Sequence, residues 1–143
     1  MSNWAGSAIC NSFKVELFRA VHDFSLDTFR LALYGSQATL DEHTTTYVVL
    51  GELLPINGYQ AGGRIVTVDP PLLAERTAIV PFSSVVWQPA SFKARRALCY
   101  NASKPGLPAL FVLDFGGERE ANGSNFTVRF PGADPTAAIV RLT

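Results

Sequence analysis

Hydrophobic and polar positions follow a helical period near the start of the chain. Residues 7–34 are its longest stretch without Gly or Pro, the two residues that interrupt helices. Charged residues separate the apolar ones, and Asn11 or Ser12 can cap the first free amide groups. The pattern predicts one short helix over residues 12–21, because apolar residues recur there at helical spacing: Phe13, Leu17, Phe18 and Val21.

After residue 27 the period changes to two. Phe29, Leu31 and Leu33 alternate with their neighbours up to Gly35, as in a strand with one buried face. Alternation and β-branched or aromatic residues predict further strands over residues 46–50, 64–68, 78–82, 84–87, 92–100, 109–115, 126–130 and 138–142. Two segments are ambiguous: 90–98 would tolerate a helix but is assigned to a strand, and the polar segment 38–46 is a helical turn or a loop.

The apolar pattern also indicates how individual strands are covered. Residues 110–113 are apolar at every position, which predicts a central strand covered on both faces. Residues 126–130 alternate apolar and polar, which predicts a strand with one exposed face nearer an edge. Gly62 and Gly63 favour a bend or a close backbone approach, and the Asp-Pro-Pro sequence at 69–71 ends any ladder because proline cannot donate to it.

These elements predict a mainly β protein, a β-sandwich or barrel-like single domain with one short N-terminal helix. A length of 143 residues is that of one domain, and 48% hydrophobic residues are enough for a sizeable core. The 11 Gly and 9 Pro limit long helices. We expect one domain over residues 1–143, in which residues 1–8 form an extended N-terminal arm.

The charge balance narrows the class of partner. Twelve Lys and Arg against twelve Asp and Glu give zero net charge, and the densest basic cluster is only Lys93, Arg95 and Arg96. We therefore expect no nucleic acid partner, because no broad positive field attracts phosphate. A lightly charged surface favours association with another protein. Neither a signal peptide nor a run of 18 apolar residues is present, so no membrane partner is expected.

Candidate reactive groups are few. Cys10 and Cys99 match no metal-ligand spacing and are interpreted as buried, without a disulfide. His22 is interpreted as a helix C-terminal or boundary residue, and His43 as part of a solvated loop. The segment 114–120 is interpreted as an acidic turn at a strand end, without the calcium-binding pattern. We expect no catalytic residue, no metal ligand and no cofactor.

Aromatic residues leave two interpretations open. Trp4, Tyr59, Trp87 and Phe92 fit core or subunit contacts, which is the more common role of single aromatics in β-rich chains. They also fit a surface that stacks on carbohydrate or bases. A hydrolase or metal-dependent enzyme is a further hypothesis, disfavoured because neither histidine has a credible partner within its own segment.

The order of short sequence phrases adds independent information. In this order the chain is similar to a family of small virion proteins of tailed bacteriophages, while residues 69–79 depart from the family's pattern. The phrases that carry the resemblance cover most of the chain: Lys14–Leu17, Val21–Phe24, Asp27–Tyr34, Ala38–Leu40, Thr45–Tyr47, Gly51–Leu53, Gly58–Gly63, Trp87, Leu98–Asn101, Leu113–Gly116, Phe126–Pro131 and Ala138–Leu142.

The resemblance implies a virion component without catalysis. We expect a capsid cement or decoration protein, not an enzyme, that binds the outer surface of the major capsid protein shell as a homotrimer and stabilises the head. Many weak contacts made by symmetric copies give such a protein large avidity. The alternative is a tail or fibre component that acts as an adaptor or binds a host glycan. Trp4, Tyr59 and Arg64 are the expected interface residues.

Overall fold

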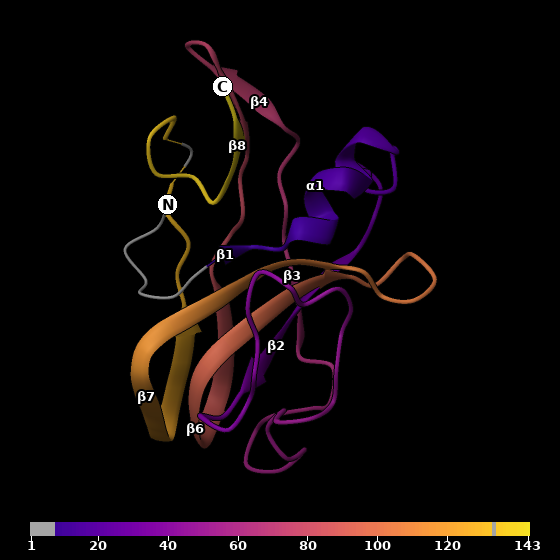
Figure 1. Ribbon diagram of the computed structural model, residues 1–143. Helices are drawn as coiled ribbons and strands as arrows, with labels where there is room; N and C mark the ends of the chain where they lie inside the picture. Colours follow the sequence, from indigo (N-terminus) through magenta and orange to yellow (C-terminus); the bar gives the residue numbers. More distant parts are fainter. Residues whose placement is uncertain (1–7, 133) are drawn as a thin grey trace.

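The computed structural model describes residues 8–132 and 134–143 (Figure 1). The residues 1–7 of the expected N-terminal arm therefore lie outside the described part. The described elements are β1 (Ala8–Ile9), α1 (Asn11–Phe18), β2 (Phe29–Tyr34), β3 (Arg64–Val66), β4 (Leu72–Ala74), β5 (Thr77–Val80), β6 (Val85–Asn101), β7 (Ala109–Val128) and β8 (Val140–Leu142).

The strands form two antiparallel sheets. The larger sheet has the order β1-β7-β6-β2-β3, and the smaller one has the order β4-β5-β8. Across the described residues the sheets do not close into a barrel, so the molecule is a sandwich-like single domain with one short N-terminal helix. The prediction of a mainly β fold is confirmed. Of the two predicted architectures, β-sandwich and barrel-like domain, the sandwich is correct.

One long hairpin, β6–β7, organises the domain. Its pairs run from Val85↔Val128 to Tyr100↔Ala109, and both strands turn back on themselves in the lower part of Figure 1. The register shifts between Trp87 and Ala90, and again between Ala94 and Arg96. Such bulges bend a strand without ending it.

The sequence prediction of four separate strands in this region is therefore wrong. Residues 84–87 and 92–100 belong to β6, apart from Ser84, while 109–115 and 126–128 belong to β7. The expected acidic turn at 114–120 lies inside β7, where Lys93↔Glu120 and Arg96↔Asp114 are cross-strand pairs of opposite charge. Gly116, with φ +80°, is accommodated within the strand instead of ending it.

The core lies on both faces of the first half of β7. Residues 110–113 are completely buried, which confirms the strand predicted to be covered on both sides. Aromatic rings fill one of these faces: the Phe82 ring meets Phe111 edge-on at a centroid distance of 5.3 Å and lies 5.6 Å from Phe130. Further along β7, Phe126 and Val128 are buried while Thr127 is exposed, which confirms the predicted alternation.

α1 differs from the predicted helix at both ends. It begins after the N-cap residue Cys10, which makes no side-chain cap bond, so neither Asn11 nor Ser12 is the cap. It ends before residue 21 because Ala20 takes the left-handed conformation, with φ +57°. The Val21 N–H bonds to the Glu16 carbonyl oxygen at 3.1 Å, and the Ala20 N–H bonds to that of Leu17 at 3.2 Å. This is the Schellman termination, formed here without glycine.

The helix buries little of its apolar surface. Phe13 is its one buried residue, and Phe18 is 91% exposed, since five positions along a helix place it on a different side from Phe13. With eight residues, α1 is too short and insufficiently apolar to cross a membrane, and it is the sole helix of the described residues.

Two further predictions about the strands are corrected. Residues 46–50 do not form a strand: Thr46 makes an isolated bridge to Pro108, and the apolar residues after it face solvent. β4 was not predicted, yet it begins directly after Pro71, because a proline blocks donation by its own residue alone. The segment 38–46 is a loop, and β8 begins two residues later than predicted.

Cys10 and Cys99 are both buried and free, as predicted. Burial, with a smaller contribution from the carboxylates of Glu16 and Asp41, raises the pKa of the Cys10 thiol to about 12. Burial also raises the pKa of Cys99. Both thiols therefore stay protonated near neutral pH, which makes them poor nucleophiles.

Candidate functional site

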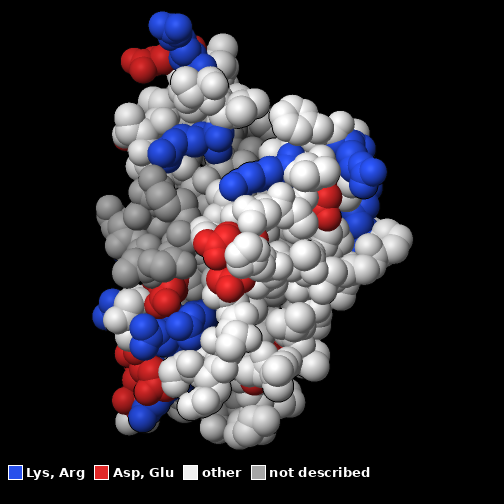
Figure 2. Space-filling view, viewed as in Figure 1, with Lys and Arg blue, Asp and Glu red and all other residues white. Residues whose placement is uncertain are grey.

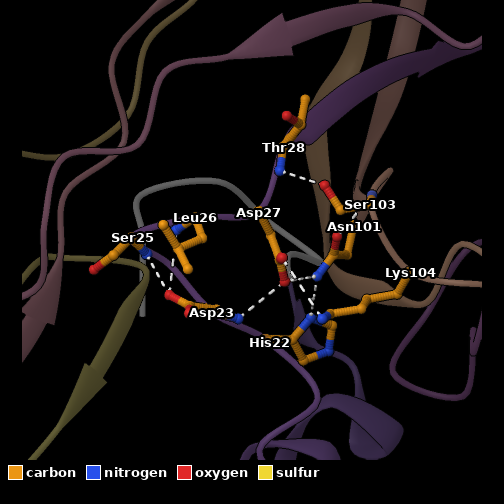
Figure 3. A network of polar contacts seen from close by, with 9 residues as sticks. All are labelled: His22, Asp23, Ser25, Leu26, Asp27, Thr28, Asn101, Ser103 and Lys104. Atoms are coloured by element: carbon orange, nitrogen blue, oxygen red, sulfur yellow. Dashed lines mark hydrogen bonds and ion pairs between the residues drawn. The ribbon is translucent and has the colours of Figure 1, made fainter.

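His22 lies at the centre of a buried polar network (Figure 3). Its Nε2 atom is 2.8 Å from Glu16 Oε1, and its Nδ1 atom is 3.0 Å from Asn101 Nδ2. An amide nitrogen can only donate, so Nδ1 accepts and the proton of the neutral ring lies on Nε2, facing Glu16. Asn101 Nδ2 also donates to Asp27 Oδ2 at 2.9 Å, and Asn101 Oδ1 accepts from the Ser103 N–H at 2.9 Å.

This network anchors the segment between α1 and β2 to the end of β6. The His22 side chain has no exposed surface, so it is a buried connector and not the boundary residue that the sequence indicated. Burial alone would raise the pKa of Asp27, but hydrogen bonds from Asn101 and from the Asp23 N–H, with Lys104 Nζ at 3.6 Å, lower it. The hydrogen-bond partners of His22 are a carboxylate and an amide, which fix the ring in place.

The other titratable groups are more dispersed. His43 is exposed, as predicted, with Nε2 at 3.6 Å from Glu42 Oε1. Asp114 lies between two guanidinium groups, 3.5 Å from the Nε atoms of both Arg95 and Arg96. Across residues 8–132 and 134–143, no three His, Cys, Asp or Glu side chains gather in a group that could hold a metal ion.

Glu52 holds together a long loop that we call the pinned loop, residues 46–63. Its Oε1 accepts a hydrogen bond from the Tyr47 hydroxyl, and its Oε2 accepts from the Tyr59 hydroxyl and, at 2.8 Å, from the Gly62 N–H. Three donors spread over sixteen residues thus converge on one carboxylate. Hydrogen bonds to a charged acceptor are the stronger kind, so they fix the shape of this loop.

Further bonds attach the pinned loop to β2 and β6. The Tyr59 hydroxyl oxygen accepts from the Leu33 N–H at 3.0 Å, and the Tyr100 hydroxyl donates to the Gly62 carbonyl oxygen at 2.7 Å. Burial raises the pKa of Tyr47 and of Tyr59, and donation to the Glu52 carboxylate raises both further. The hydroxyl groups therefore remain protonated donors at any pH at which the protein works.

Glycine is required where the pinned loop touches the sheet. A Cβ atom on Gly63 would lie 1.9 Å from the Leu31 carbonyl oxygen, and one on Gly58 would lie 2.2 Å from that of Pro89. Both residues also have positive φ, +80° and +98°. The close backbone approach predicted for the glycines at 62–63 is therefore confirmed.

The pinned loop directs apolar side chains to solvent. Val49 and Leu50 are 72% and 81% exposed, and three more apolar residues of the loop are exposed as well: Val48, Leu54 and Ile56. Glu52 is the one charged residue between His43 and Arg64, and its carboxylate is occupied internally. Figure 2 shows mixed groups of both signs elsewhere on this face, including its lower left, while its lower right, over the loops between β2 and β3, is largely uncharged.

A hollow of about 720 Å³ lies beside the pinned loop. We call it the arginine-lined hollow. The start of β6 contributes Trp87 and Gln88, and β2 and β3 contribute Arg30, Arg64 and Ile65. The pinned loop supplies the remaining lining residues: Pro55, Ile56, Asn57, Gly58, Tyr59, Gln60 and Gly63.

The expected interface residues fall in different environments. Trp4 lies outside the described residues. Tyr59 and Arg64 both line the arginine-lined hollow, but Tyr59 is only 2% exposed, so a partner would meet the loop around it rather than its ring. Arg64 is exposed on the edge strand β3. Trp87 and Tyr59 are core aromatics with ring centroids 6.4 Å apart, and Phe92 packs against the same core.

Sequence reasoning missed the exposed apolar residues, because it assigned 46–50 to a strand. The available signal was a run of twenty residues, 44–63, with a single charge. Comparisons with protein-family models, with curated proteins and with solved structures found no match. The candidate site is therefore defined by its own geometry, as a loop with a single charged residue, held by internal hydrogen bonds, beside a hollow lined with hydrogen-bond donors.

Proposed function

We propose that this protein is a bacteriophage capsid cement protein that binds the outer surface of the major capsid protein shell as a homotrimer. The observation that carries the proposal is the pinned loop, which holds exposed apolar side chains on a backbone fixed by Glu52. The order of sequence phrases shared with small virion proteins of tailed phages supports it. Neither argument involves a reactive group.

A fixed apolar loop is suited to binding a large protein surface. Ordering a flexible loop on binding costs free energy, and a loop that is already ordered avoids much of that cost. Fully burying a Leu or Val side chain contributes roughly 1.5–3 kcal/mol, so a few of them give a modest interface. Three copies bound together and repeated over a shell multiply that modest affinity into strong attachment.

Shells that lack the protein provide the test. Purified wild-type protein should bind them and raise the temperature at which they release DNA, whereas Leu50→Asp should abolish binding without unfolding the protein. Leu73→Asp is the matched control, because Leu73 is 71% exposed but lies in β4, at the opposite end of the molecule in Figure 1. Wild-type binding by Leu50→Asp, or shells whose stability does not change, would refute the proposal.

A tail or fibre component is the second candidate. The arginine-lined hollow favours it, because its amide and guanidinium groups suit the hydroxyl groups of a host glycan. Cryo-electron microscopy of the virion separates the two candidates by location. Copy number separates them as well, because a shell protein is present in far more copies than a tail protein.

A further inference from the structure

The arginine-lined hollow carries positive charge that its own lining does not neutralise. Arg30 and Arg64 line it, and no Asp or Glu of the described part of the chain does. Among the described residues Arg64 makes no ion pair, and Arg30 donates to the neutral carbonyl oxygens of Gly62 and Gly63, at 3.4 and 2.8 Å. The Glu52 carboxylate accepts a hydrogen bond from the Gly62 N–H at 2.8 Å. Even with Glu52 counted, two guanidinium groups face one carboxylate.

The remaining polar groups of the hollow favour a ligand that accepts hydrogen bonds. Asn57, Gln60 and Gln88 are exposed and each offers an amide N–H₂ group. Trp87 also lines the hollow, and its indole N–H is buried and has no acceptor among the described residues. Guanidinium groups prefer carboxylates, which they bind through charge-assisted bonds. The chemistry of the lining therefore selects an acidic ligand.

The hollow also borders an open sheet edge. β3 is the last strand in the order β1-β7-β6-β2-β3, and within residues 8–132 and 134–143 it pairs with β2 alone, through Arg64, Ile65 and Val66. An edge strand directs part of its backbone N–H and C=O groups away from the sheet, where an extended segment can pair with them. Such a segment, laid along β3, would pass its side chains over the hollow.

We propose that the arginine-lined hollow binds an extended acidic segment of the partner protein, which pairs with β3 and places a carboxylate against Arg64 and Arg30. The inference rests on the proposed function where it takes the shell as that partner. The chain's own residues 1–7 are not the occupant, because they contain no acidic side chain.

A synthetic decapeptide of alternating Val and Glu serves as the probe, and its Val-Gln analogue is the uncharged control. The readout is the NMR signal of the Trp87 indole N–H in a Trp4→Phe background, which leaves one Trp. The Val-Glu peptide should shift this signal saturably, together with the amide signals of Arg64–Val66. The Val-Gln peptide should bind at least tenfold more weakly, as expected when a charge-assisted bond is lost.

Arg64→Gln tests the residue itself, since its exposed side chain can change without unfolding the domain. It should weaken binding of the Val-Glu peptide about tenfold, while Arg129→Gln, an exposed arginine outside the hollow, should not. Equal binding of both peptides, or unchanged binding by Arg64→Gln, would overturn the proposal. Self-association that Arg64→Gln abolishes, without peptide binding, would assign the hollow to a second copy and overturn it as well.

Shell binding separates this inference from the proposed function. Peptide binding by a protein that fails to bind shells would refute the cement function and leave the acidic ligand in place. Shell binding that is unaffected by Arg64→Gln, in a protein that ignores the peptide, would refute the inference and leave the cement function in place.

Discussion

Tyr59 donates its hydroxyl hydrogen to Glu52 Oε2, and the same hydroxyl oxygen accepts a hydrogen bond from the Leu33 N–H at 3.0 Å. The pair therefore connects three parts of the chain: the middle of the pinned loop, its C-terminal half and β2. Because Glu52 also accepts from Tyr47 and from the Gly62 N–H, its removal affects the loop as a whole.

Glu52→Gln should destabilise the protein by about 2 kcal/mol, because hydrogen bonds to a charged acceptor contribute about 1.5–3 kcal/mol each and an amide nitrogen cannot accept. Urea unfolding measures this loss. Glu42→Gln is the control, since its carboxylate is exposed, and should change stability by less than about 0.5 kcal/mol. A similarly small effect for Glu52→Gln would show that the carboxylate does not hold the loop.

Gly63→Ala should prevent stable folding of the pinned loop. Its Cβ would lie 1.9 Å from the Leu31 carbonyl oxygen, which is backbone and cannot move aside cheaply. Gly117→Ala is the matched control, because nothing lies within 4 Å of a Cβ at that position and φ there is not positive. Thermal unfolding compares the two variants; equal melting temperatures would contradict the close approach.

Ala20→Gly should stabilise the protein by about 1 kcal/mol. A left-handed conformation strains an L-residue by roughly 1–2 kcal/mol, whereas glycine adopts it without such strain. Lys14→Gly, inside the same helix, should instead destabilise it by about 0.8–1 kcal/mol. Opposite signs in the two urea midpoints are the expected result. Destabilisation by both would mean that Ala20 is not the helix-terminating residue.

The four tyrosines should resist ionisation in the native protein. Burial raises the pKa of Tyr34, Tyr47, Tyr59 and Tyr100 above the ordinary value of 10.0. The unfolded chain therefore loses protons first, so the contribution of the tyrosines to stability should be constant below about pH 10 and should fall as the pH rises above it. Tyrosinate absorbance should appear together with unfolding; a native titration near pH 10 would count against the burial of these hydroxyl groups.

The lowered pKa of Asp27 predicts how the stability of the protein changes at acid pH. This pKa lies below the ordinary value of 3.8 in the folded protein, so the contribution of Asp27 is complete above that value and is lost as the pH falls through the folded pKa. The stability gap between wild type and Asp27→Asn should therefore close in acid. A gap that is the same at neutral and at strongly acidic pH would show that the charge of Asp27 plays no part.

The periodicity of the sequence was sufficient for the class of fold and for several strands. The alternation from Phe29 onward and the fully apolar residues 110–113 report burial directly, and both were confirmed. The β6–β7 hairpin was broken into four strands because Pro89, Gly116 and Gly123 look like ends in a sequence. In the structure these residues lie within the two long strands, whose register shifts absorb irregular backbone.

The candidate site was less predictable. Val48, Val49 and Leu50 have strand-like side chains, yet they face solvent because bonds made by Glu52 and Tyr34 hold the loop away from a ladder. Arg30 and Arg64 lie 34 positions apart in the sequence and meet at the hollow through the pairing of β2 with β3. Such meetings depend on tertiary contacts, which the local pattern does not contain.

The folded-back hairpin has a mechanical consequence. β6 and β7 pass through the bend as continuous strands with paired backbones, so the two halves of the hairpin on either side of the bend are directly connected. A pull on the pinned loop would load the β2–β6 ladder along its length, so that many hydrogen bonds share the force. We therefore expect the domain to deform little under load and to transmit force between the neighbours that it binds.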